Sequence, residues 1–149
     1  MPIKINISPE EMVRKVMPPM EDIERRCILA LRRAMYEAVN YAKGLNTYKD
    51  KTGNLRSSIL FQTYKDGTLV DSFSSGGQGA EEGKKVADAE KDKSAKQIYS
   101  VIVAGMHYAS YVEAKGYDVL TGAELRLETI VKPYLEEALK DTGLIIREL

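Results

Sequence analysis

The sequence has one cysteine, one histidine and no excess of charge of either sign. Because a single cysteine, Cys27, cannot form a disulfide within the chain, an oxidising compartment is not indicated. The 22 basic residues are matched by 22 acidic residues, so the formal net charge is zero. Broad binding to nucleic acid requires a basic surface that neutralises phosphates. The charge balance therefore argues against such binding, although it leaves a local basic patch open.

Long apolar runs are also lacking. No run approaches the roughly 18 residues of a membrane-spanning helix. Residues 1–12 lack the positive segment and the apolar run of a signal peptide. We therefore expect a cytosolic protein without membrane association. With 149 residues and 44% hydrophobic content, the chain is expected to form a single domain over residues 1–149.

Patterns that carry chemistry are scarce. The sequence has no H-E-x-x-H motif and no cluster of cysteine and histidine. A triad of His107, Ser110 and Glu113 can be written, but His107 and Ser110 lie three apart on one expected short helix, without a nucleophile elbow. The glycine-rich stretch at 77–85, GQGAEEGKK, lacks the Ser or Thr that follows the lysine of a phosphate loop. We expect no catalytic residues, no metal and no cofactor.

Helical periodicity is clearest near the N-terminus. A capping signature of Ser8, Pro9 and Glu11 predicts a short helix, which the prolines at 18 and 19 stop. A long helix over about 20–43 is expected next, with Gly44 at its end. Its apolar residues recur at spacings of three and four: Met20, Ile23, Cys27, Leu31, Ala34, Ala38 and Tyr41. Cys27 is thereby interpreted as a small core residue.

Strand signals follow in the middle of the chain. Asp66-Gly67 lies between two β-rich runs and predicts a hairpin. The run at 98–105, IYSVIVAG, predicts a further strand. A short helix over 107–116 and a C-terminal helix from Thr121 complete the pattern, with a kink or break expected near Pro133. The expected fold is α+β, with a small antiparallel sheet packed by the long N-terminal helix and the C-terminal helix.

Residues 74–97 differ in composition from the rest. They are rich in Gly, Ser, Ala, Lys and Glu, and Val86 is their only large aliphatic residue. Such a segment buries too little apolar surface to fix itself. We expect a mobile excursion between strands.

The stretch at 105–124, GMHYASYVEAKGYDVLTGAE, concentrates tyrosines around the single histidine. Stacking on nucleic acid would need interleaved basic residues, but only Lys115 lies near Tyr108 and Tyr111. The helical spacing of these tyrosines favours packing, with hydroxyl groups that can reach an interface. Glu113 can be a solvated carboxylate or an ion-pair partner across a subunit boundary. We interpret the stretch as a structural joint at an interface.

Three motifs occur in a fixed order: TGNLRSSI at 52–59, YASYVEAKG at 108–116 and KPYLEEAL at 132–139. Together they resemble the tail-completion, or neck, protein family of long-tailed double-stranded DNA phages. Members read T-G-x-L-R-x-S-I, then Y-A-x-x-V-E-x-G, then P-[FY]-L-x-x-A-L. The matching positions are Thr52, Gly53, Leu55, Arg56, Ser58, Ile59, Tyr108, Ala109, Val112, Glu113, Pro133, Tyr134, Leu135, Ala138 and Leu139. Gly116 is displaced by one position, and the link to the last helix is longer than usual.

The resemblance implies a non-catalytic virion protein at the head–tail junction, with helices packed on a small antiparallel sheet. It also implies a homo-oligomeric ring, commonly of six subunits, next to head-completion and tail-tube or tail-terminator proteins. The tail-completion, head-completion and tail-terminator roles stay open. Candidate interface residues are Arg56, Tyr108, Tyr111 and Glu113. The alternative is a small cytosolic nucleic-acid-binding regulator that uses the arginines of the long helix: Arg25, Arg26, Arg32 and Arg33.

Overall fold

A computed structural model describes residue 4 and residues 19–46, 48–91 and 97–146. The helix expected from Ser8 lies outside these residues. The described elements, in chain order, are α2 (Met20–Gly44), α3 (Asn54–Ser57), β1 (Ile59–Lys65), β2 (Thr68–Phe73), α4 (Gln78–Ala89), β3 (Ile98–Ala104), α5 (Ala109–Ala114), α6 (Thr121–Leu139) and the short 3-10 helix η1 (Lys140–Thr142).

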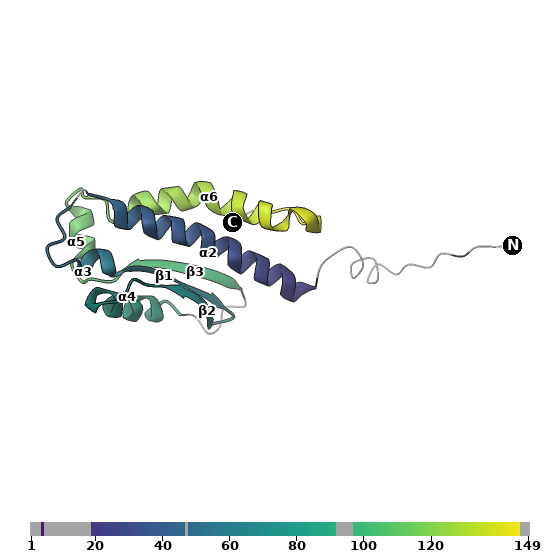
Figure 1. The fold of residues 1–149 in the computed structure, drawn as a ribbon, viewed down its shortest axis with the longest axis horizontal. Helices are drawn as coiled ribbons and strands as arrows, with labels where there is room; N and C mark the ends of the chain where they lie inside the picture. Colours follow the sequence, from purple (N-terminus) through teal and green to yellow (C-terminus); the bar gives the residue numbers. More distant parts are fainter. Residues whose placement is uncertain (1–3, 5–18, 47, 92–96, 147–149) are drawn as a thin grey trace.

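The elements stack in layers (Figure 1). Helix α2 covers one face of the sheet, α4 covers the opposite face, and α6 lies on α2. The α+β architecture expected from the sequence is confirmed. One detail differs, because α6 packs mainly on α2 rather than on the sheet, and α4 is the second helix that covers a sheet face.

Strand β1 is the centre of a three-stranded antiparallel sheet with the order β2-β1-β3. Its residues from Ile59 to Tyr64 are all buried. Ile59 and Phe61 pack in the main core with α2, whereas Leu60 packs with Ala87 of α4. The hairpin to β2 turns at Asp66 and Gly67, which have φ of 50° and 78°. Two successive positive φ values define the type I′ turn that Asp-Gly favours.

Helix α2 has the expected bounds but a different buried face. Ile23, Ala34 and Ala38 are buried as expected, whereas Met20 is 65% exposed and Tyr41 is 39% exposed. Cys27 and Leu31 are only partly buried. The reason is that α2 is covered by the sheet and by α6 at once, so residues on two sides of the helix are buried. The residues buried along α2 are Ile23, Ala30, Ala34, Met35, Ala38, Val39 and Ala42.

Helix α4 lies within the segment that we expected to be a mobile excursion, and here the structure differs from the expectation. Glycine lets the backbone of α4 come close to α3 and to the residue that leads into β1. A Cβ atom on Gly79 would lie 2.1 Å from the carbonyl oxygen of Asn54, and one on Gly83 would lie 2.5 Å from that of Ser58. Composition misled because close backbone packing here replaces large side chains. Residues 92–96 of the same segment lie outside the described residues.

Helix α6 continues through Pro133, so of the kink or break that we expected, the break does not occur. Proline removes one backbone hydrogen bond, here the bond to the carbonyl of Thr129. Pro133 and Thr129 both lie on the exposed side of the helix, whereas Leu135 and Leu139 are buried. The proline is therefore tolerated on the face that carries no packing.

Substitution of Gly83 tests the contact between α4 and the sheet. We expect Gly83→Ala to lower the free energy of unfolding by about 2–3 kcal/mol, because the added methyl group overlaps the backbone at Ser58. Urea denaturation provides the measurement. The control is Gly44→Ala, whose added Cβ meets no atom within 4 Å. Equal stability of the two variants would contradict the described packing of α4.

Candidate subunit interface

Four elements meet at one end of the molecule. Figure 1 shows α3 and α5 at this end, where α2 finishes and α6 starts. The sequence motifs around Arg56 and Glu113 therefore lie in the same region, although they are far apart in the chain. We call this region the joint end and define it by residues 45–57 and 106–122.

The carboxylate of Glu113 closes the link between α5 and α6. One oxygen accepts hydrogen bonds from the backbone N–H groups of Val119 and Leu120, at 2.7 and 3.0 Å. The other accepts from the N–H of Thr121, at 3.2 Å, and from its hydroxyl group. Thr121 is the first residue of α6 and Leu120 is its N-cap, and N–H donors at the start of a helix have no partner inside the helix. Glu113 thus acts as a remote cap for α6.

This cap lowers the pKa of the Glu113 carboxyl group. Burial alone raises the pKa of Glu113, but hydrogen bonds from Thr121, Leu120 and Val119 outweigh burial and hold the pKa below its usual value. The sequence offered two interpretations of Glu113, a solvated carboxylate and an ion-pair partner across a subunit boundary. The structure instead gives its two oxygens four donors within the chain.

Arg56 is also bonded within the chain. Its guanidinium donates to the carbonyl oxygen of Leu45, just after α2, at 2.7 Å, and lies 5.1 Å from the ring centre of Tyr48. Its backbone N–H donates to the carboxylate of Asp50 at 2.8 Å. The side chain of this candidate interface residue therefore fixes the loop that follows α2.

The tyrosines expected at the interface separate into two environments. Tyr108 is partly buried and packs against the main core, and its ring meets that of exposed His107 edge-on. Tyr111 is 62% exposed, with the ammonium of Lys115 5.1 Å from its ring centre. Of the four candidate residues, Tyr111 is therefore the one that mainly faces outward.

Two tyrosines that the sequence interpretation missed join Tyr111 around a surface hollow. This hollow of about 480 Å³ is lined by Asn46, Tyr48, Lys49, Tyr111, Val112, Lys115 and Tyr117. Tyr48 is buried, and within the described residues its hydroxyl group has no hydrogen-bond partner. Tyr117 is 48% exposed. Tyr117 lies in the tyrosine-rich stretch at 105–124 but was not among the candidates, whereas Tyr48 comes from the distant loop after α2 and is brought to the hollow only by the fold.

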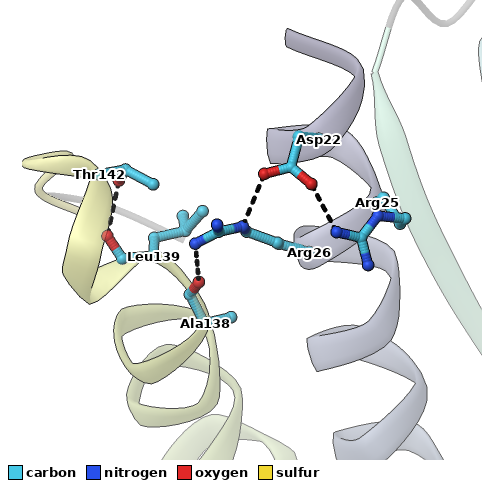
Figure 2. A network of polar contacts seen from close by, with 6 residues as sticks. All are labelled: Asp22, Arg25, Arg26, Ala138, Leu139 and Thr142. Atoms are coloured by element: carbon cyan, nitrogen blue, oxygen red, sulfur yellow. Dashed lines mark hydrogen bonds and ion pairs between the residues drawn. The ribbon is translucent and has the colours of Figure 1, made fainter. Parts of the chain in front are cut away.

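The arginines of α2 have acidic partners. Figure 2 shows the carboxylate of Asp22 between Arg25 and Arg26, and Arg26 reaching the carbonyl oxygen of Ala138 in α6. The hydrogen bond from Arg25 is the main cause that lowers the pKa of Asp22.

The other two arginines of the same helix are paired as well. Arg32 lies 3.7 Å from Asp71, and Arg33 lies 3.5 Å from Glu137 while covering the ring of Tyr134 at 4.1 Å. This face carries mixed charge rather than the basic patch that phosphate binding needs.

Groups suited to chemistry are dispersed over the described residues. Among them, no three His, Cys, Asp or Glu side chains are placed to hold a metal ion. The carboxylate of Glu113 is taken up by α6, so it does not orient His107. Burial is the main cause that raises the pKa of the Cys27 thiol, which keeps it protonated, although Cys27 is partly buried rather than the core residue that we expected.

Comparison with known proteins adds no relative. No family model matches the chain, and neither does any curated protein or solved structure. Within the described residues, no helix is both long enough and apolar enough to cross a membrane.

The cap on α6 predicts a pH-dependent loss of stability. We expect Glu113→Gln to lower the free energy of unfolding by about 1 kcal/mol at pH 7, the scale of a lost helix cap. The pKa of Glu113 is lowered in the folded state. Its contribution is therefore complete above the unfolded value of about 4.3 and is lost as the pH falls through the lowered folded value. Urea denaturation curves of wild type and variant should converge in acid.

Glu128→Gln is the control, because Glu128 is exposed on the same helix. We expect this change to leave stability within about 0.5 kcal/mol of wild type. A Glu113→Gln effect that is the same at every pH would rule out the carboxylate as its source.

Proposed function

We propose that the protein is a structural subunit of a phage or prophage virion, in the tail-completion or neck ring at the head–tail junction. The observation that carries the proposal is the arrangement of the joint end. Residues of the first two resembling motifs hold this end together from within, and the exposed side chains of Tyr111 and Tyr117 lie beside them.

The first motif supports the proposal that motif residues hold the joint end together from within. Gly53 has φ of 74°, and the hydroxyl group of Thr52 accepts from the N–H of Asn54 at 3.3 Å. Leu55 and Ile59 are buried. These residues therefore shape the turn that leads into β1.

The second motif supports it in the same way, and the third motif fixes α6 to α2 farther along the helix. Glu113 caps α6, and Ala109 is buried. The hydroxyl group of Tyr134 donates to Glu37 of α2, and Leu135 is buried. Motif residues that serve architecture are expected of an assembly subunit, whereas an enzyme also needs reactive groups that converge.

The exposed surface favours protein contacts. Tyrosine is enriched in protein–protein interfaces, where its ring buries apolar area and its hydroxyl group stays bonded. The hollow at the joint end exposes Tyr111 and Tyr117 beside Lys49 and Lys115. We infer that this hollow receives part of an adjacent subunit or of a neighbouring head or tail protein. The regulator alternative is less well supported, because the arginines of α2 are paired with acidic residues.

Light scattering over a wide concentration range tests the proposal. Wild type should assemble well beyond the 16.7 kDa of one chain, alone or with the products of the genes that flank its own. Tyr111→Ser should weaken assembly by about tenfold or more, as for a tyrosine at the centre of an interface. The control Val86→Ser, an exposed residue of α4, should assemble as wild type does. A wild type that stays monomeric under all of these conditions would contradict the proposed function.

A further inference from the structure

The hollow at the joint end combines tyrosine side chains with the ammonium groups of two lysines. Lys49 and Lys115 are exposed, and within the described residues neither lies in an ion pair. Two acidic residues of the joint end are bonded elsewhere, because Asp50 accepts from the backbone N–H of Arg56 at 2.8 Å and Glu113 caps α6. The hollow therefore suits a ligand that brings apolar side chains together with a carboxylate.

The turn of the β-hairpin lies far from this hollow. Figure 1 shows α3 and α5 at one end of the sheet and the turn between β1 and β2 at the other end. Strand β1 has seven residues, so at roughly 3.3 Å per residue about 20 Å of strand separates the turn from the joint end. We call residues 66–70 the hairpin tip. Because of this separation, the hairpin tip of one copy cannot enter the hollow of the same copy.

The hairpin tip exposes two aliphatic side chains. Leu69 is 46% exposed and Val70 is 41% exposed. The register with β1 shifts between Thr63 and Tyr64, which makes Val70 the extra residue of a β-bulge. Bulges re-aim side chains and recur beside functional sites. Both aliphatic side chains are therefore available to another molecule, on a hairpin whose turn is fixed by the two positive φ values described above.

The charge at the hairpin tip is opposite to that of the hollow. Asp66 is exposed, and the neighbouring Lys65 pairs with Glu24 of α2. This hydrogen bond is the main cause that raises the pKa of Lys65, and the charges of Asp66 and Glu21 raise it further. Within the described residues, one ammonium group thus faces three carboxylates. Negative charge is in excess around it.

We propose that the hairpin tip of one copy inserts into the hollow at the joint end of the next copy. The inference rests on the proposed function and names the occupant of its hollow. Leu69 and Val70 pack against the tyrosines of the hollow, and the carboxylate of Asp66 pairs with its lysines. The hairpin tip and the hollow are different surfaces, so the contact is head-to-tail, as a closed ring requires. Complementary charge of this kind fixes orientation and partner choice more than affinity.

Cross-linking in a Cys27→Ser background tests the contact. One chain carries Thr68→Cys in the hairpin tip and the other carries Asn46→Cys at the hollow, and both positions are exposed. A short bismaleimide is used, because it joins thiols across a gap too wide for a disulfide. The chains are mixed alone and with the products of the flanking genes, and the mixture should yield a cross-linked pair. Val86→Cys, 40% exposed on α4, is the control and should not cross-link to Asn46→Cys.

The other outcomes overturn the proposal. An equal yield with Val86→Cys would show that the hairpin tip is not the specific occupant of the hollow. Light scattering on the same mixtures before the linker is added separates the two proposals. Assembly without the cross-link would leave the virion subunit standing and reject the hairpin contact, whereas a lack of assembly in every preparation would reject both.

A matched pair of substitutions gives a second readout. Val70→Ser should weaken assembly by about tenfold or more, because it removes an apolar contact. Val86→Ser, which has nearly the same exposure on α4, should leave assembly unchanged. Thermal unfolding at low concentration should be similar for the two variants, since neither side chain lies in the core. Equal assembly of the two variants would contradict the proposal.

Removal of the charge gives a third readout. Asp66→Asn keeps a residue that tolerates positive φ but removes the carboxylate. Assembly should weaken by about threefold, the scale of an exposed ion pair. It should also depend less on ionic strength, because salt screens the pairing with Lys49 and Lys115. Assembly with the affinity and salt dependence of wild type would reject the role of Asp66 in the contact.

Discussion

The central strand must be covered on both faces, and the rest of the structure depends on this constraint. A three-stranded sheet has a single strand with neighbours on both sides, here β1, and its residues from Ile59 to Tyr64 are buried. Helix α2 supplies the cover on one face through ordinary apolar packing. Helix α4 supplies it on the other face, where Gly83 lies close to the backbone of Ser58 and the side chain of Leu60. Since little apolar side-chain area is available in α4, the lack of a side chain at Gly83 decides how closely the helix approaches this face.

The same constraint organises the joint end. Ser58, directly before β1, accepts hydrogen bonds from the N–H of Gly105 through both its carbonyl oxygen, at 3.2 Å, and its hydroxyl group, at 3.1 Å. The entry to β1 and the exit from β3 are thus fixed to each other. Glu113 then connects α5, which follows β3, to the N-terminus of α6. Arg56 and Glu113 are bonded within these loops, whereas Tyr111 and Tyr117 are exposed on their surface. Such a distribution supports the proposal of a subunit that binds other proteins.

The elements predictable from sequence were those with a local signal. Asp66-Gly67 predicted the hairpin, the apolar run at 98–105 predicted β3, and Gly44 marked the end of α2. Helix α4 was missed because a count of apolar side chains gives no information on the close backbone contacts that glycine allows. The buried face of α2 was placed only in part, since periodicity does not reveal that a helix is covered on two sides.

The candidate site was less predictable than the fold. Tyr111 was identified from its local cluster and is exposed, as an interface residue should be in a free subunit. The capping role of Glu113 depends on the loop that brings Thr121, eight residues later, back beside the Glu113 carboxylate. No local sequence signal predicts the conformation of that loop. Tyr48 and Tyr117 line one hollow but lie in separate loops, so only tertiary structure could pair them.

The most direct test of the account is electron microscopy of negatively stained wild-type protein, prepared alone at high concentration and together with the products of its flanking genes. The account predicts closed particles with rotational symmetry and a central opening, built from head-to-tail contacts. Open filaments, or particles of only the 16.7 kDa of one chain in every preparation, would contradict it.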